Sequence, residues 1–198
     1  MSFRISPPMY SKLELEQLWL ERLSLEGRHH WQLAAPQSQK QFTSKANKKR
    51  KPAFLLADSQ QQTLMEYKVS LKELRNKLVD ICSSQYAVET CGFVAFDKKS
   101  KKYVLTVEKN ESPDPANFFI INPVRFLNCK NKYDLIGVFH SHITADETPS
   151  EFDIKMSEAC CVPFVIYSLN TYKFSIYSPK HKDVEQETIN KITAKLSQ

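Results

Sequence analysis

The chain has 198 residues, of which 41% are hydrophobic and 25% are charged, and these values suit one packed domain with an appendage. No apolar run approaches the roughly 20 residues of a membrane-spanning helix, and the first residues lack the apolar core of a signal peptide, so we expect synthesis in the cytoplasm and no membrane span. The five cysteines include no CxxC pair, which argues against a disulfide framework and against a cysteine-ligated zinc.

Residues 1–65 are predicted to form an amino-terminal arm that is largely extended. One short helix is expected over residues 11–26, and beyond it the hydrophobic periodicity is lost. The net charge of the chain is +6, and part of the excess lies in the run KANKKRK at residues 45–51. This run is either a solvated linker or an electrostatic contact with nucleic acid or an acidic protein. Because no aromatic residues interleave it, a stacking single-strand binder of nucleic acid is not expected.

The same arm carries isolated aromatic residues: Trp31, Phe42 and Phe54. They are either scattered apolar side chains or anchors that dock on a partner. Basic segments with little regular structure tend to order when they bind. We therefore treat residues 1–65 as a candidate partner-binding arm.

A compact domain is predicted over residues 66–198, with strands and helices mixed along the chain. Helical or alternating spacing of apolar residues, together with capping and turn residues, predicts each element. Helices are expected at 69–84, 123–130, 151–159 and 183–196, and strands at 89–96, 103–108, 118–121, 134–140, 163–168 and 172–177. This order indicates an α/β (α+β) fold in which helices pack on a sheet.

The segment HSHITADETPSEFD holds a candidate metal site at the end of the apolar strand 134–140. Residues two apart on a strand point to the same face, so His140 and His142 can approach one ion. Asp153 falls in the first turn of the following helix, from where it can turn back toward the strand. Two histidines, one carboxylate and one open position are typical of a catalytic zinc site, whereas a structural site is closed. Histidines at the end of an apolar strand are rarely needed for packing, so a packing role is the weaker interpretation.

Glu89 is the candidate acid/base, since a carboxylate that leads into the apolar strand CGFVAF has no amphipathic reason to be there. Ser150 has two interpretations that are compatible with each other. Its position predicts a helix cap, and its hydroxyl can also stabilise the oxyanion of a tetrahedral intermediate. The remaining histidines show no metal-ligand spacing and are expected at the surface: His29, His30 and His181.

The pattern H-x-H-x7-S-x-x-D, with Glu89 in an E-x-C-G context, resembles the JAMM/MPN metalloprotease family. Within it, the stretches ETCGFVA and NESPDPANFFIINP are similar to tail-tip assembly proteins of lambda-like siphophages. The resemblance covers residues 69–179 and departs from the family at Ile143, where a proline is usual. It implies a cytidine-deaminase-like mixed sheet flanked by helices, and hydrolysis of a peptide or isopeptide bond. The implied roles are Zn²⁺ ligation by His140, His142 and Asp153, acid/base catalysis by Glu89 and oxyanion stabilisation by Ser150.

The resemblance leaves two functions open. One is a zinc peptidase that acts during tail-tip assembly or on a cell-wall peptide. The other is a structural tail-tip subunit that uses the fold as a wedge and residues 1–65 to bind neighbouring tail-tip or baseplate proteins. A ubiquitin-type deconjugating enzyme shares the chemistry but fits the local match less well. Either of the first two functions places the protein in the virion, at the tail tip, after assembly in the host cytoplasm.

Overall fold

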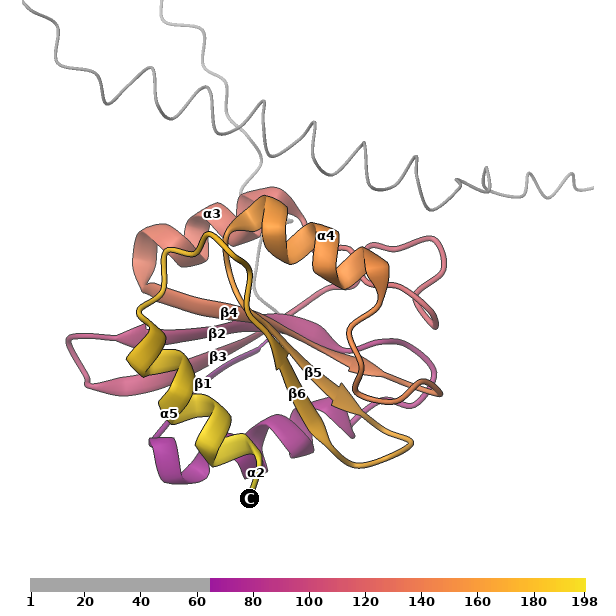
Figure 1. Ribbon diagram of the computed structural model, residues 1–198, viewed down its shortest axis with the longest axis horizontal. Coiled ribbons are helices and arrows are strands. Elements are labelled where there is room, and N and C mark those ends of the chain that lie inside the picture. Colours follow the sequence, from indigo (N-terminus) through magenta and orange to yellow (C-terminus); the bar gives the residue numbers. More distant parts are fainter. Residues whose placement is uncertain (1–64) are drawn as a thin grey trace, which may run out of the picture.

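The structure is a computed structural model, and it describes residues 65–198 (Figure 1). The predictions for the arm, which comprise the helix at 11–26, the basic run at 45–51 and the isolated aromatic residues, lie outside the described residues.

Six strands form one mixed sheet in the order β1-β3-β2-β4-β5-β6. Their bounds are β1 (Met65–Val69), β2 (Cys91–Asp97), β3 (Lys102–Glu108), β4 (Asp134–His142), β5 (Phe164–Ser168) and β6 (Phe174–Tyr177). All neighbouring strands are antiparallel except β4 and β5, which are parallel. A parallel pair needs a crossover connection, and the segment that contains α4 supplies it.

Four helices cover the two faces of the sheet in the described part of the chain: α2 (Leu71–Cys82), α3 (Pro123–Lys132), α4 (Glu151–Cys160) and α5 (Gln186–Leu196). Helices α3 and α4 lie on one face, and α2 and α5 on the other (Figure 1). Each face has its own apolar core, with Leu74, Leu78 and Ile192 on the α2/α5 side and Phe126, Phe152 and Met156 on the α3/α4 side. The predicted mixed sheet flanked by helices is confirmed.

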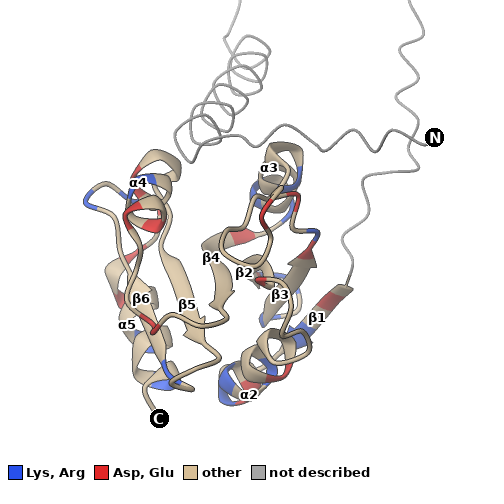
Figure 2. Ribbon diagram, turned by 90° about the vertical axis from the view of Figure 1, so that its right-hand side faces the viewer, with Lys and Arg blue, Asp and Glu red and all other residues tan. Residues whose placement is uncertain are grey.

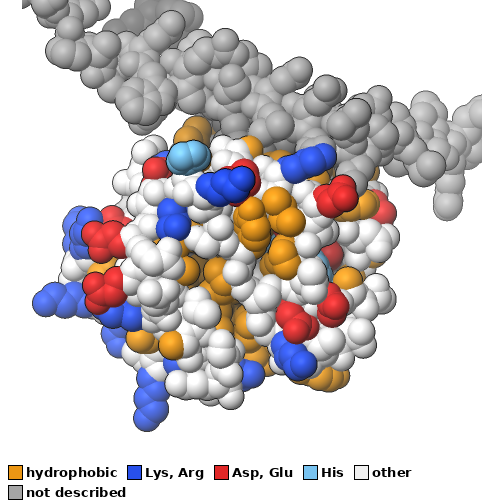
Figure 3. Space-filling view, in the orientation of Figure 1, with side chains coloured by type: hydrophobic (Ala, Val, Ile, Leu, Met, Phe, Trp, Pro, Cys, Tyr) orange, Lys and Arg blue, Asp and Glu red, His pale blue; other side chains and the backbone are white. Residues whose placement is uncertain are grey.

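Charged residues lie mainly on the helices, at the strand ends and in the turns, as the coloured ribbon shows (Figure 2). Lysines gather at the turn between β2 and β3, at the left edge of the space-filling view (Figure 3). The exposed lysines of this turn are Lys98, Lys99, Lys101 and Lys102. The turn lies at the end of the sheet where β4 begins, because β2 residue Phe96 pairs with Asp134. The opposite end of β4 carries the two histidines.

Two strand predictions need correction. Residues 118–121 are not a strand, because the backbone around them is bonded mainly by the side chain of Asn110. Its Oδ1 accepts the Ile120 N–H at 3.1 Å and its Nδ2 donates to the Phe118 carbonyl at 3.0 Å. Strand β1, which pairs antiparallel with β3, was not predicted at all.

The helix predicted from residue 69 begins later, because Val69 belongs to β1. Ser70 is the N-cap of α2, and its N–H and hydroxyl both donate to the Glu73 carboxylate, at 2.9 and 2.6 Å. This bonding fixes the boundary between strand and helix at one residue. The other predicted helices and strands agree with the structure to within about three residues at their ends.

All five cysteines lie in the described residues and are free thiols, four of them buried and Cys161 half-buried. No helix in residues 65–198 has the length and apolarity needed to cross a membrane.

Candidate metal centre

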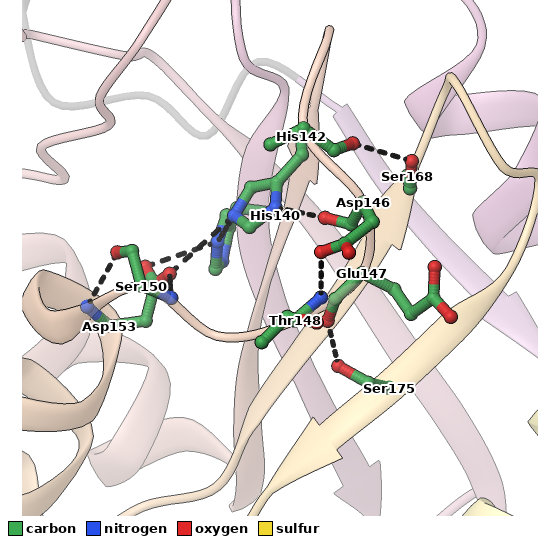
Figure 4. Close-up of polar contacts among 10 residues, drawn as sticks. His140, His142, Asp146, Glu147, Thr148, Ser150, Asp153, Ser168 and Ser175 are labelled. Atoms are coloured by element: carbon green, nitrogen blue, oxygen red, sulfur yellow. Dashed lines mark hydrogen bonds and ion pairs between the residues drawn. The ribbon is translucent and has the colours of Figure 1, made fainter.

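Strand β4 carries both candidate histidines, and it runs two residues further than predicted, through His142. His140 lies opposite Cys91 of β2 and Ile166 of β5, so it is enclosed on both sides within the sheet. The two histidines are 1% and 6% exposed. Their rings point toward the start of α4, where Asp153 lies (Figure 4). The strand geometry therefore brings both imidazoles to one point, as the i, i+2 spacing predicts.

The donor atoms of His140, His142 and Asp153 converge. The two Nε2 atoms are 3.2 Å apart, and they lie 3.2 Å (His140) and 3.5 Å (His142) from the Asp153 carboxylate oxygens. A tetrahedral ion with ligands at about 2.0–2.1 Å has ligand atoms about 3.3 Å apart. All three residues are buried, and their ligand atoms lie within 4.8 Å of one another. The three side chains therefore fit a metal ion with tetrahedral geometry.

Helix α4 positions Asp153. Ser150 is its N-cap, and the Ser150 hydroxyl accepts the Asp153 N–H at 3.2 Å while the Ser150 N–H donates to Asp153 Oδ2 at 2.7 Å. This reciprocal capping box holds the carboxylate at the positive end of the helix dipole. The Asp153 carboxylate therefore caps the start of α4 and also faces the two histidines.

The orientation of His142 is fixed by a backbone contact. Its Nδ1 lies 2.6 Å from the Asp146 carbonyl oxygen, so Nδ1 carries the proton and Nε2 is left as a ligand. The ring of His140 stacks on Phe119, with centroids 4.4 Å apart. Nδ1 of His140 has no hydrogen-bond partner among the described residues, so its ring is held by packing rather than by a second-shell hydrogen bond.

The electrostatics of the group suit a cation. Burial alone would raise the pKa of Asp153, but the charge and hydrogen bond of His140, with the bonds from His142 and Ser150, hold that pKa well below its usual range. Burial works against a charged His142, yet the Asp153 hydrogen bond and the Asp146 carbonyl raise the pKa of His142 overall. Positive charge between the rings and the carboxylate is thus stabilised.

Glu89 shares a cleft with this group. The cleft has a volume of about 120 Å³, and its lining includes Glu89, Phe118, His142, Ser150 and Asp153. Glu89 is 6% exposed. Burial raises the pKa of Glu89 to about 8, and the nearby Asp153 and Asp114 carboxylates add to this effect while His142 opposes it. A carboxyl group with this pKa can hold or release a proton near neutral pH.

The part of the chain that matches a known family includes the residues of this candidate site. A model of the prokaryotic homologs of the JAB domain matches residues 71–179, which is more than half of the chain. The chain belongs to this family. The match contains all five residues singled out in the sequence: Glu89, His140, His142, Ser150 and Asp153.

Individual relatives of this JAB domain are distant. The tail tip assembly protein K of Escherichia phage N15 is 27% identical over 99 residues, which are 48% of this chain and 40% of that protein. The chain thus spans well under half the length of this relative. Two solved structures are similar. Protein DSY2949 from Desulfitobacterium hafniense is 17% identical, and the match covers 60% of this chain and 94% of that chain with a TM-score of 0.40. AF2198, a JAB1/MPN domain protein from Archaeoglobus fulgidus, is 18% identical, and the match covers 60% of this chain and 95% of that chain with a TM-score of 0.35.

The loop after the second histidine of this JAB domain begins with Ile143, and side chains from the β5–β6 region hold it through hydrogen bonds. The Ser168 hydroxyl donates to the Ala145 carbonyl at 2.7 Å, and Asn170 Nδ2 donates to the Thr144 carbonyl at 3.1 Å. The Ser175 hydroxyl donates to the Glu147 carbonyl. Hydrogen bonds from three side chains of the β5–β6 region therefore fix the backbone of this loop.

Three residues of the site were not foreseen from the sequence. Asp146 orients His142 through its carbonyl, and Ser141 and Asn110 bond the backbone around Glu89. Backbone carbonyls leave no signal in a sequence. For Ser141, its place between two ligand histidines was the available signal, and for Asn110, its place at the start of a proline-rich loop. His181 is exposed, as predicted.

Proposed function

We propose that this protein is a zinc-dependent peptidase-fold component of a siphophage tail tip that takes part in tail assembly. The observation that carries the enzymatic part is the convergence of two Nε2 atoms and the Asp153 carboxylate in a cleft that Glu89 also lines. The distant relation to a tail tip assembly protein supports the assembly part. The substrate class is a peptide or isopeptide, since that is the bond this chemistry hydrolyses.

His140, His142 and Asp153 would hold the zinc ion. Zinc bound by these three residues would supply Lewis-acid chemistry for a water molecule and for the carbonyl group of the bond to be cleaved. Glu89 takes the proton of the attacking water and passes it to the leaving nitrogen, for which its raised pKa suits it. Ser150 faces the same cleft. Its oxygen accepts the helix-capping bond from Asp153, and its hydrogen donates to the developing oxyanion.

Metal analysis of the purified protein tests the ligand set. We expect about one zinc per chain in the wild type and in His181→Ala, whose histidine is exposed, and little or none in His142→Ala. Equal zinc in all three proteins would rule out the ligand assignment.

A cleavage assay with tail-tip proteins and peptidoglycan peptides tests the catalytic roles. Glu89→Gln should keep the zinc and lose roughly 100-fold or more of the hydrolysis rate, because a general acid/base contributes about that much. A Glu89→Gln rate within a few fold of the wild type would contradict the role of Glu89.

A non-catalytic, structural subunit of the tail tip is the second candidate. The basic run and the isolated aromatic residues of the arm favour it. In this case the JAB domain serves as a wedge, and residues 1–65 bind neighbouring proteins. Phage carrying His142→Ala would then assemble infectious particles, whereas the enzymatic proposal expects a loss of infectivity.

A further inference from the structure

Glu89 is not held by the sheet. Strand β2 begins two residues later, at Cys91, so Glu89 and Thr90 lie outside the regular ladder. Their backbone groups nevertheless all have partners. The Glu89 N–H donates to the Pro115 carbonyl at 2.6 Å, and the other three groups are bonded by Ser141 and Asn110. The backbone of Glu89 is therefore fixed by hydrogen bonds, although the residue lies outside a strand.

Ser141 ties this segment to the metal-ligand strand. Its hydroxyl accepts the Thr90 N–H at 2.9 Å, and its own N–H donates to the Thr90 carbonyl at 2.9 Å. Ser141 is fully buried and lies between His140 and His142 on β4. Because neighbouring residues of a strand point to opposite faces, Ser141 reaches Thr90 while both histidines face the metal position.

Asn110 ties the same segment to the loop that forms one wall of the cleft. Its Nδ2 donates to the Glu89 carbonyl at 3.1 Å, the Phe118 carbonyl at 3.0 Å and, more weakly, the Pro115 carbonyl at 3.4 Å. Its Oδ1 accepts the N–H groups of Ser112 and Ile120 at 3.0 and 3.1 Å. A side-chain amide carries two N–H donors and a carbonyl acceptor, so Asn110 can bond backbone carbonyl and N–H groups at the same time. Asn110 is thus bonded to Glu89 and to both ends of the turn that carries the cleft wall.

We propose that Asn110 and Ser141 are positioning residues that set the placement of Glu89 relative to the metal position. The proposal rests on the proposed function of the site. Ser141 bonds Thr90, the neighbour of Glu89, to the strand that carries the candidate ligands, and Asn110 bonds Glu89 itself to the wall of the cleft at Phe118. Removal of the Asn110 side chain or of the Ser141 hydroxyl should leave the three candidate ligands in place, because none of their side chains is hydrogen-bonded to either group. Metal binding and Glu89 placement are therefore separable.

The test uses the full chain loaded with Co²⁺, whose visible absorption responds to its ligands and to the groups beside them. Wild type, Glu89→Gln, Asn110→Ala, Ser141→Ala and the control Asn128→Ala are compared, the last being an exposed asparagine on α3. All five should bind about one Co²⁺ per chain. We expect the spectra of Asn110→Ala and Ser141→Ala to shift toward that of Glu89→Gln, and the Asn128→Ala spectrum to match the wild type.

Amide hydrogen exchange of the metal-free proteins gives a second readout. The Thr90 amide in Ser141→Ala and the Glu89 amide in Asn110→Ala should exchange roughly tenfold faster than in the wild type. Should Asn110→Ala fail to fold, Ser141→Ala, which removes a single oxygen atom, decides the outcome. The exchange measurement needs no metal, so it tests the bonding independently of the proposed chemistry.

The outcomes separate the two proposals. If Glu89→Gln has the spectrum of the wild type, the role of Glu89 fails and this inference fails with it. If Glu89→Gln differs but Asn110→Ala and Ser141→Ala keep the wild-type spectrum, the inference alone is wrong, and the two residues merely stabilise the fold.

Discussion

Burial of Glu89 raises its pKa into the range that the proposed acid/base role needs, and the same burial lowers the stability of the fold when Glu89 is ionised. The side chain is buried, and the opposing effect of His142 does not offset that burial, so the ionised form of Glu89 is disfavoured in the folded protein. The unfolded chain ionises near 4.5, whereas the folded metal-free protein holds the proton to about 8. The unfolded state therefore binds fewer protons than the folded state between these two values.

From this difference we expect Glu89 to contribute a loss of stability in the metal-free protein as the pH rises from about 4.5 to about 8, by about 1.4 kcal/mol for each pH unit in that window. Glu89→Gln removes this contribution, so its free energy of unfolding should exceed that of the wild type by a margin that grows with pH. Urea unfolding in a chelator at pH 5, 6, 7 and 8 measures the margin. The exposed Glu111→Gln is the control and should follow the wild type; a constant Glu89→Gln margin would contradict the assignment.

Gly92 is a second residue whose identity is dictated by its neighbours. A Cβ at this position would lie 1.8 Å from the Thr106 carbonyl oxygen and 2.7 Å from the Phe139 ring. We expect Gly92→Ala to destabilise the domain by roughly 3 kcal/mol or more, because backbone on the β3 side cannot move away without breaking the ladder. Thermal and urea unfolding measure the effect. A loss below about 1 kcal/mol would mean that β2 and β3 can separate locally.

At the scale of elements, the sequence predicted the ligand half of the site better than the acid/base half. The i, i+2 histidines and the Ser150 cap depend on local periodicity, and both predictions agree with the observed β4 and α4. Glu89 was placed at the first position of a strand, but β2 begins only at Cys91. What fixes Glu89 and its neighbour Thr90 is a set of hydrogen bonds that span 21 to 51 positions along the chain, and local patterns do not report such contacts.

The strand errors have a similar cause. Residues 118–121 have an apolar pattern that suits a strand, yet a single asparagine bonds their backbone and competes with any ladder. Strand β1 is short and carries Glu66 and Lys68 on one face. Both are paired through their side chains, Glu66 with Lys132 and Lys68 with Asp97, so their polarity hides the strand from a hydrophobicity pattern.

The loop between β4 and α4 depends on the β5–β6 turn, and Ser168 is the contact that we expect to matter most. Its hydroxyl donates to the Ala145 carbonyl and accepts from the N–H of Thr171 at 3.0 Å. Ser168→Ala should cost about 1–3 kcal/mol of stability. It should also weaken zinc binding by roughly tenfold, because the Asp146 carbonyl that orients His142 lies next in the chain.

Urea unfolding and competition with a zinc chelator measure the two effects of Ser168→Ala. Ser197→Ala, at an exposed position after α5, is the matched control and should change neither quantity by much. Lower stability with unchanged zinc affinity would show that the loop keeps its shape without Ser168.

At the scale of the whole molecule, the site and the lysine-rich β2–β3 turn occupy opposite ends of β4. Residues 1–64 directly precede Met65, the first residue of β1, which pairs with Val107 at the site end of β3. A partner bound to the arm would therefore be tethered to the edge of the sheet at the same end as the cleft. This placement suits the proposal that residues 1–65 bring the domain to neighbouring tail proteins.

Deletion of residues 1–62 tests the arm. We expect the shortened protein to keep the unfolding transition and about one zinc per chain, because the core and the ligands lie within the described residues. Incorporation into phage tails should be lost, as measured by the protein content of purified particles. Particles that contain the shortened protein at the wild-type level would rule out the arm as the attachment segment.

The reciprocal bonding of Ser150 and Asp153 has a consequence for the order in which the site can form. All three ligands come from one contiguous stretch of 14 residues, His140 to Asp153, closed by a helix cap. Glu89 joins only when β2, which begins two residues after it, has paired with β4 across the intervening residues 98–133. Closing a short loop is faster and costs less entropy than closing a long one. If His140, His142 and Asp153 hold zinc as proposed, the three ligands can assemble before Glu89 joins them, and metal content then reports an earlier stage of folding than catalytic competence does.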